Sequence, residues 1–426
     1  TLTGALAVDG GTVKLDGNYP TGTDNVALGN TSLGNVEAGG TNNVAIGDDS
    51  LKALTTGDNN TAVGYRSLKT AVTSLSNTAI GSLALCTNTG GNNTAIGANA
   101  MECNTSGDNN TAVGKQANFK NTTGASNTSI GNEALKCNTT ASNNTAVGRL
   151  SLAANTTGTQ NTAVGFCSLN ANTTGANNVA IGVQALDTNT TANENVAVGR
   201  CSLFSNTEGT KNIAIGSYSL DTNSTGDSNI AIGYQALDAN TTADNNVAVG
   251  DSALKANTTG TNNVAVGKDA LLANVSGQQN VAIGVCALNA NTGYNNVAIG
   301  YQALDANIGG DSNVAVGLHS LLLNTTGNYN VAVGRKALCS NTTGLTNVAI
   351  GLTALNDNTE GTNNIAIGCA ALLDHSTGNN NVAIGVATLF DNTTASDNTA
   401  LGSYSMVKNT TGTANLAAGT NAMACN

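Results

Sequence analysis

One seventeen-residue phrase repeats from end to end of this chain, and this period constrains the fold more than any other feature. Its clearest form is N-V-A-I-G-x-x-A-L-x-x-N-T-T-G-x-N. The glycine that closes the N-x-A-x-G segment first occurs at Gly29 and last at Gly419, in steps that are nearly all 17 residues, which makes 24 copies. A fixed period of this length predicts a solenoid, in which each copy forms one coil stacked on its neighbours.

The composition fits thin coils better than the core of a compact enzyme. Aromatic residues make up 3% of the chain and charged residues 10%, with no tryptophan, whereas an ordinary core needs more large side chains. The abundant Asn, Thr and Gly are also typical of disordered segments. The strict phase of Val, Ile and Leu argues against disorder, because a disordered chain needs no register.

The alternation within one coil predicts short strands and tight corners. Residues 179–181 read as a strand that ends at Gly182, with Val and Ile on one face and the intervening Ala on the other. We expect a second short strand to begin at residues 185–186, and residues 189–192 to turn the chain back. With the Val, Ile and Leu columns placed inside, the prediction is an all-β parallel β-solenoid of 24 coils, about 115 Å long at about 4.8 Å per coil.

Asparagine forms two columns along the predicted stack. One stands four residues before every marker glycine, from Asn25 to Asn415, and a second runs from Asn88 to Asn426 with an interruption at His375. Identical amides stacked about 4.8 Å apart can hydrogen-bond along a column. We therefore predict a structural ladder whose central members are Asn178, Asn195, Asn212 and Asn229.

If Val and Ile face inward, the alanine between them faces outward on nearly every coil. This alanine stripe includes Ala180, Ala197, Ala214 and Ala231. A long exposed apolar stripe normally marks an interface, and small side chains let two backbones approach closely. We expect three copies of the chain to pack about a common axis through this stripe.

The repeat also resembles those of known fibrous proteins. N-V-A-I-G, followed by a small residue and a later glycine corner, resembles the head repeat of YadA-like trimeric autotransporter adhesins. The longer form N-T-A-I-G-x-x-A-L-x-x-N-T-T-G is similar to repeats in tail-fibre-like structural proteins of marine bacteriophages. The resemblance implies a left-handed β-roll, a homotrimer, and a place outside the cell or on the virion surface. The repeat is longer than usual for the adhesins, and no neck, heptad stalk or membrane anchor is recognisable.

Two regions are predicted along the chain. Residues 1–24 form an extended N-terminal segment for attachment or capping, and residues 25–426 form the solenoid, which is irregular to about residue 80. The nine cysteines fall at several phases of the repeat, so we expect free thiols rather than a disulfide framework. Cys86 and Cys103, on adjacent coils at nearly the same phase, are the one pair that could be bridged.

The sequence carries little that points to catalysis or to a bound cofactor. His319 and His375 are about three coils apart, which does not suit a zinc site. Acidic residues are stacked on neighbouring coils in two places, where either structural calcium or solvated corners would fit. The stacked pairs are Asp221 with Asp238 and Asp227 with Asp244. No nucleophile elbow or phosphate loop occurs in a strand-to-helix context, so we predict neither an enzyme nor a cofactor.

The most variable slots are the two that follow each marker glycine. They hold most of the tyrosines, including Tyr218, Tyr234 and Tyr301, which could contact a cell-surface glycan or a protein receptor. The net charge is −11 and the cations are scattered, which disfavours nucleic-acid binding. No apolar stretch reaches the roughly 18 residues of a membrane span.

Three functions remain open from the sequence. The first is a trimeric structural rod of the fibre or adhesin type, which extends or presents an attachment module on a phage tail or bacterial surface. The second is an extracellular filament whose subunits stack head to tail, with residues 1–24 completing the last coil of the next subunit. The third is an ice-binding solenoid, because threonine pairs such as Thr190–Thr191 recur on most coils.

Overall fold

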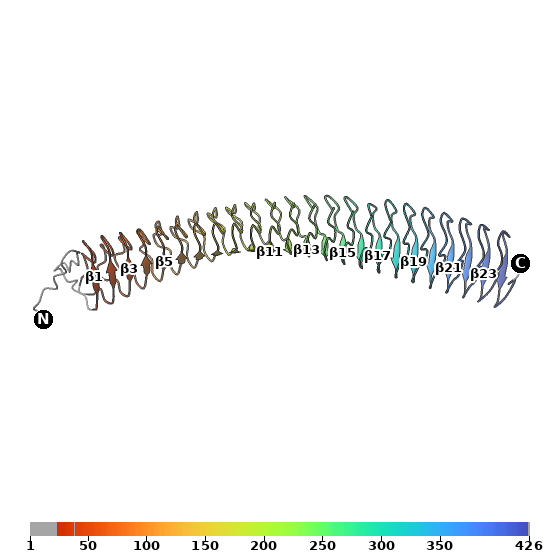
Figure 1. The fold of residues 1–426 in the computed structure, drawn as a ribbon, viewed down its shortest axis with the longest axis horizontal. Helices are drawn as coiled ribbons and strands as arrows, with labels where there is room; N and C mark the ends of the chain where they lie inside the picture. Colours follow the sequence, from red (N-terminus) through yellow and green to blue (C-terminus); the bar gives the residue numbers. More distant parts are fainter. Residues whose placement is uncertain (1–23, 38, 425–426) are drawn as a thin grey trace, which may run out of the picture. The chain divides into compact units, whose positions relative to one another are not determined.

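The predicted all-β solenoid with a seventeen-residue repeat is confirmed. The computed structural model describes residues 24–37 and 39–424, so nearly all of the predicted N-terminal segment lies outside the described residues. Each coil in the described ranges contributes one three-residue strand and no helix (Figure 1). The chain divides into two compact units, unit 1 (residues 1–208) and unit 2 (residues 209–426), which are described separately.

Unit 1 contains eleven strands, one for each coil. They are β1 (Val26–Leu28), β2 (Val44–Ile46), β3 (Thr61–Val63), β4 (Thr78–Ile80), β5 (Thr94–Ile96), β6 (Thr111–Val113), β7 (Thr128–Ile130), β8 (Thr145–Val147), β9 (Thr162–Val164), β10 (Val179–Ile181) and β11 (Val196–Val198). Strands consecutive in the chain pair in parallel, so each coil rests on the one before it.

Unit 2 contains thirteen strands of the same length. They are β12 (Ile213–Ile215), β13 (Ile230–Ile232), β14 (Val247–Val249), β15 (Val264–Val266), β16 (Val281–Ile283), β17 (Val297–Ile299), β18 (Val314–Val316), β19 (Val331–Val333), β20 (Val348–Ile350), β21 (Ile365–Ile367), β22 (Val382–Ile384), β23 (Thr399–Leu401) and β24 (Leu416–Ala418). Here too every strand pairs in parallel with the next.

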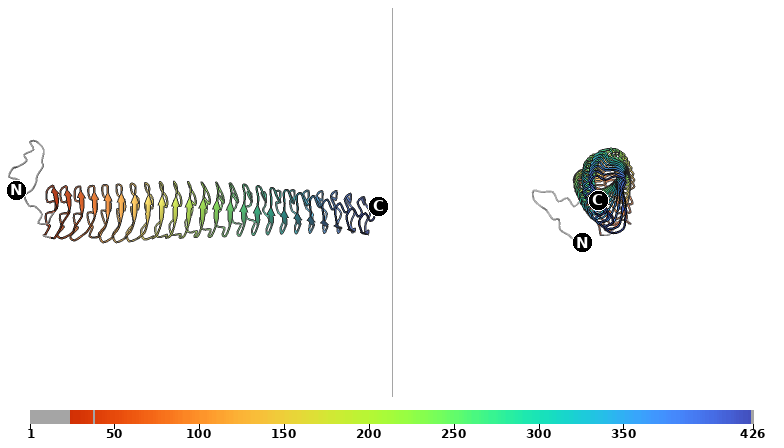
Figure 2. Two further views of the ribbon diagram at one scale, coloured as in Figure 1. Left: turned by 90° about the horizontal axis from the view of Figure 1, so that it is seen from below. Right: turned by 90° about the vertical axis from the view of Figure 1, so that its right-hand side faces the viewer.

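The pairing is in register at the level of the repeat. In unit 1 Ala180 pairs with Ala197, and in unit 2 Ala214 pairs with Ala231. Within each unit the strands therefore form one row (Figure 2), and the register places equivalent residues of successive coils in columns. The surfaces of each unit therefore consist of columns of equivalent side chains.

The marker glycine ends each strand because no other residue fits there. Gly182 has a φ of 138°, a conformation that L side chains rarely adopt. A Cβ atom at this position would lie 2.4 Å from the carbonyl oxygen of Gly199 on the next coil. The corner thus combines an unusual backbone angle with close contact between coils, which explains the strict recurrence of glycine.

The predicted second strand at residues 185–186 is wrong. Leu186 has a φ of 55°, in the left-handed region, and belongs to a turn. Ala185 and Leu186 are both fully buried, whereas two consecutive residues of an extended strand would point to opposite faces. The left-handed leucine therefore turns the chain so that two successive side chains enter the interior.

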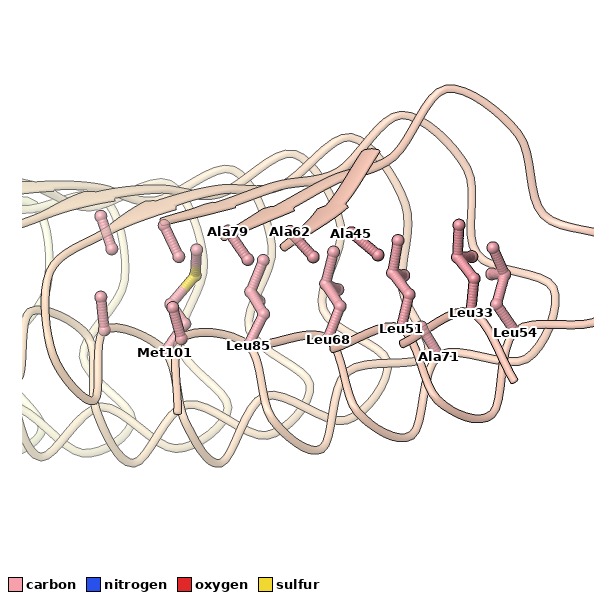
Figure 3. Close-up of a cluster of buried hydrophobic side chains, with 14 of the residues drawn as sticks. Leu33, Ala45, Leu51, Leu54, Ala62, Leu68, Ala71, Ala79, Leu85 and Met101 are labelled. Atoms are coloured by element: carbon pink, nitrogen blue, oxygen red, sulfur yellow. The ribbon is translucent and has the colours of Figure 1, made fainter. Parts of the chain in front are cut away.

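The predicted orientation of the first strand is also wrong. The alanine of each V-A-I segment faces the interior, and the Val and Ile on either side of it face outward. The four alanines of the predicted interface stripe are fully buried within the chain: Ala180, Ala197, Ala214 and Ala231. Figure 3 shows leucines pointing across the interior toward strand alanines, namely Leu51, Leu68 and Leu85 toward Ala45, Ala62 and Ala79. Because leucine fills the space from the opposite wall, only a methyl group fits on the strand side.

Candidate interaction surfaces

The predicted asparagine ladder is confirmed and lies inside the solenoid. The backbone N–H of Asn195 donates to Oδ1 of Asn178 at 3.0 Å, and that of Asn229 donates to Oδ1 of Asn212 at 2.9 Å. The Asn178 Nδ2 also donates to the carbonyl oxygen of Ala192 at 2.8 Å. All four asparagines are fully buried. The column therefore satisfies backbone groups at the corners and is not available to a partner.

The second asparagine column forms another internal ladder. The Asn172 Nδ2 donates to Oδ1 of Asn155 at 2.8 Å and to the carbonyl oxygen of Gly175 at 3.0 Å. In the early coils of unit 1 the same slot is apolar, with Leu54 and Ala71 fully buried. These columns satisfy polar groups in the interior, as buried amides require.

The first threonine of each Thr-Thr pair completes a third set of contacts between coils. The Oγ1 of Thr173 donates to the carbonyl oxygen of Thr190 at 3.0 Å, and the Oγ1 of Thr190 donates to that of Thr207 at 3.4 Å. Only the second threonine, such as Thr191, is exposed. One half of the predicted ice-binding pair is therefore engaged within the protein.

Since the alanine column is buried, the apolar surface open to a partner lies on the other side of the sheet. We call this surface the outer face and define it as the first and third residues of each strand. Ile181 in unit 1 is 40% exposed, and Ile215 and Ile299 in unit 2 are 39% and 38% exposed. The outer face carries no charged residue on any of the 24 strands. It is a continuous uncharged surface within each unit.

The first column of the outer face differs between the units. In unit 1 it is threonine on seven successive strands: Thr61, Thr78, Thr94, Thr111, Thr128, Thr145 and Thr162. In unit 2 it is valine or isoleucine on every strand from β12 to β22. The two side chains have nearly the same shape, so unit 1 presents hydroxyl groups where unit 2 presents methyl groups.

The tyrosines lie at exposed corners next to the outer face. Tyr234 and Tyr301 are 51% and 49% exposed. The ring of Tyr234 meets that of Tyr218 edge to face, with centroids 6.3 Å apart, and the ring of Tyr301 lies 5.6 Å from that of His319. Exposed rings with a polar tip can contact a glycan or a protein, and these pairs are separate sites along unit 2.

The acidic residues considered for calcium have two different settings. The Oδ1 of Asp227 accepts the backbone N–H of Thr210 at 2.6 Å, and that of Asp244 accepts the backbone N–H of Asp227 at 2.7 Å. These carboxylates support corners. Burial, and then the charge of Asp238, raise the pKa of Asp221 to about 6. Among the described residues no group of three His, Cys, Asp or Glu side chains is arranged to hold a metal ion.

One compact group of charges occurs at an early corner of unit 1. The Nζ of Lys52 lies 2.7 Å from Oδ1 of Asp49, while Arg66 and Lys69 approach Oδ2 of the same carboxylate at 3.5 and 3.8 Å. Hydrogen bonds from Lys52 and Thr31 lower the pKa of Asp49 to about 2. This cluster ties together coils that precede the second asparagine ladder.

The two histidines have different surroundings, and the cysteines in the described part of the chain are unpaired. His319 is half-buried at a corner, where its Nε2 lies 3.1 Å from Oε1 of Gln302, whereas His375 is fully buried in the second ladder. The cysteines at 86, 103, 137, 167, 201, 286, 339 and 369 are free thiols. Burial raises the pKa of Cys86 and of Cys103, which disfavours the nucleophilic thiolate.

The chain was also compared with known proteins. In the described ranges it has no helix of the length and apolar character needed to cross a membrane. No protein family matches the sequence, and no curated protein matches it significantly. The outer face and the tyrosine corners are accordingly the features on which a function can be argued.

Proposed function

We propose that this protein is a structural fibre subunit that associates as a homotrimer through its outer face and extends or presents an attachment module on a phage tail or bacterial surface. The observation that carries the proposal is a charge-free Val/Ile surface on the exposed side of a parallel sheet. Parallel sheets are normally covered on both faces. The interior covers one face of this sheet, and a second and third copy of the chain would cover the other.

The size of the outer face suits this occupant. Each coil adds about 4.8 Å of length, and the two outward columns together are about 10 Å wide, so the strands of both units present on the order of 1,000 Å². A stable protein interface needs about 800 Å² from each partner. Monomeric soluble proteins rarely leave an apolar patch of this size exposed.

The resemblance to trimeric adhesin heads and to phage tail-fibre repeats supports the same proposal. In the adhesin heads coils of this kind associate as three chains. The coil architecture also suits an extracellular fibre, because within each unit backbone and side-chain hydrogen bonds join successive coils and the corners are short. Such a molecule gives a protease few loops to cut. The tyrosine corners beside the outer face would be free to contact a glycan or protein receptor.

The oligomeric state tests the proposal. Light scattering should give three times the chain mass of 42.1 kDa. Ile299→Asp, on the outer face, should dissociate the trimer because three carboxylates would meet at the interface. Ile308→Asp is the matched control, since Ile308 is 56% exposed on the same coil but lies outside the strand. A wild-type monomer, or equal effects of the two substitutions, would refute the trimer, and open-ended filaments would favour head-to-tail stacking.

The threonine column of unit 1 favours one second candidate, an ice-binding surface. Seven hydroxyl groups in register about 4.8 Å apart on a parallel sheet form a regular array for ordered water. This array lies on the strands, as the first residue of each, unlike the Thr-Thr pairs at the corners. A thermal-hysteresis measurement tests the candidate, and the loss of hysteresis in Thr111→Val/Thr128→Val would assign the activity to this column.

A further inference from the structure

His375 is the one interruption of the second asparagine ladder after Asn88 in the described residues. It belongs to unit 2 and is fully buried. In the coils on either side the same slot is held by Asn358 and Asn392. A titratable ring therefore occupies a position that is otherwise an uncharged amide.

Both ring nitrogens of His375 have hydrogen-bonding partners. Nε2 lies 2.8 Å from the carbonyl oxygen of Gly378, and Nδ1 lies 2.8 Å from the carbonyl oxygen and 3.3 Å from Nδ2 of Asn392. A neutral ring with its proton on Nε2 donates to Gly378 and accepts from the Asn392 amide. A protonated ring would instead donate to both carbonyl oxygens, and the Asn392 amide would then donate only to the carbonyl oxygen of Ala395, 3.2 Å from its Nδ2.

The histidine also leaves the ladder broken on its other side. The Nδ2 of Asn358 donates to Oδ1 of Asn341 at 2.7 Å, as elsewhere in the column. The Oδ1 of Asn358 is buried and has no hydrogen-bonding partner, because its donor would be the amide of an asparagine at position 375. An unpaired buried acceptor weakens the contact between these two coils.

The charged groups near this coil are carboxylates on the adjacent column. Asp357, Asp374 and Asp391 precede the ladder slot on three successive coils, and Lys408 follows on the next. Burial and the charges of the two flanking aspartates raise the pKa of Asp374. The groups that contact the His375 ring itself are uncharged amides and carbonyls, so no carboxylate pairs with an imidazolium. Burial lowers the pKa of His375, and its two backbone hydrogen bonds oppose this effect in part.

We propose that His375 is a pH-sensitive break in the ladder, at which the coils around residues 358–392 open locally when the ring is protonated in mildly acidic solution. A charge buried without a counterion is unfavourable, whereas an opened coil exposes the ring to water. In the folded state the pKa of His375 lies below its ordinary value of about 6.5. The contribution of the neutral ring to stability is therefore fully present above that pH and is lost as the pH falls below it.

Hydrogen exchange of the full chain tests the proposal. Protection of peptides from residues 358–392 should be compared between the wild type and His375→Asn, which restores the ladder, at pH 7.5 and pH 5.0. The ratio of wild-type to variant exchange at equal pH cancels the intrinsic pH dependence. We expect this ratio to rise on acidification by up to about 30-fold, the limit set by protonation of an exposed histidine at pH 5.0.

The aspartate column is expected to change stability with pH in the opposite direction to His375. A carboxyl group whose pKa is raised by folding favours the folded state in acid. Asp374→Asn in the wild-type background provides the control, and the rise in the ratio should persist in it. An unchanged ratio, or better protection of the wild type at pH 5.0, would overturn the proposal. Loss of the rise in Asp374→Asn would also overturn it, since the switch would then lie in the aspartates.

Discussion

The outer faces of the two units have the same backbone arrangement but different side chains. From β3 to β9 the first outward column is threonine, and from β12 to β22 it is valine or isoleucine. The inward residue is a fully buried alanine on nearly all of these strands, with Ser129 on β7 as the exception. On these strands the first outward position is always a β-branched residue, in both units. The polarity of that residue differs between the units.

This difference predicts an uneven interface between chains. A hydroxyl group buried without a hydrogen bond costs roughly 1–3 kcal/mol in proteins. The face of unit 2 can therefore pack against a partner without water. Burial of the threonine hydroxyl groups of unit 1 is favourable only if water molecules bridge them to the partner. In the proposed trimer most of the association free energy would come from unit 2.

Exchanging the two columns should give the largest effect. Threonine at Val247, Val264, Val281 and Val297 would give unit 2 the chemistry of unit 1. We expect each substitution to weaken association by about 1 kcal/mol per chain, or about 4 kcal/mol for all four. The dissociation constant of the oligomer, followed by light scattering on dilution, measures this change.

The reciprocal exchange provides the control for that experiment. Valine at Thr94, Thr111, Thr128 and Thr145 should strengthen association or leave it unchanged. Equal weakening by both sets of substitutions would show that shape alone matters on the outer face. The comparison between the units would then carry no information on assembly.

The second difference between the units lies in the core. The position equivalent to Leu186, which has a left-handed backbone conformation and points into the core, is leucine on every coil of unit 2 from Leu220 to Leu389. In unit 1 this position includes Asn118, whose two side-chain amide atoms are buried without hydrogen-bonding partners. Leu271→Asn should destabilise unit 2 by about 3 kcal/mol. Asn118→Leu should stabilise unit 1 by about 1–2 kcal/mol because it removes two buried amide atoms without partners. The gain is not larger because asparagine tolerates the left-handed conformation better than leucine does.

Hydrogen exchange resolved by unit measures both core substitutions. Each should change protection chiefly in the coils around its own position, because a solenoid is stabilised by contacts between neighbours. A loss of stability in Asn118→Leu would mean that the amide has partners that the leucine removes.

The smallest expected effect concerns pH. The pKa of Asp221 in unit 2 is raised to about 6. Protonated Asp221 therefore favours the folded state of unit 2 in acid, and the free energy of unfolding decreases as the pH rises from about 4 to 6. The side chain is partly exposed, which reduces the penalty to about 1 kcal/mol, and Asp221→Asn should recover it above pH 6. In unit 1 the pKa of Asp49 is lowered to about 2, so its stabilisation is lost only as the pH falls from about 4 toward 2.

Unit-resolved protection between pH 3 and pH 7 separates these two carboxylates. The coils around Asp221 should weaken on going from pH 4 to pH 6, and the coils around Asp49 should weaken below pH 4; both are distant in the sequence from the coils around His375, where acid has the opposite effect. The Asp221→Asn and Asp49→Asn variants should each flatten only their own transition. A shared transition in both units would assign the pH dependence to net charge instead.

Several structural features followed from the sequence because they depend only on spacing. The seventeen-residue step predicted the coils and their parallel stacking. The invariant asparagine before each strand predicted the buried ladder at Asn178 and Asn195. Each of these features repeats along the chain, so stacking alone brings its copies together.

The direction in which the strand side chains point was not recovered, although the sequence held a signal for it. The V-A-I alternation places Val and Ile on one side and Ala on the other, but is the same whichever side faces inward. The run of threonines from Thr61 to Thr162 was the signal. A slot that accepts a hydroxyl on seven successive coils, with no acceptor evident in the sequence, is more readily explained by exposure to solvent.

The sequence by itself determined the period, the number of coils, the position of the one strand in each coil and the columns of this protein, although it also suggested a second strand that does not form. Only the tertiary structure decided which columns face the interior. The reason is the width of a coil: the left-handed leucine enters from the opposite wall together with its neighbouring alanine and leaves room for one methyl group beneath the strand. That packing turns valine and isoleucine outward, where they form the surface proposed to bind the other chains.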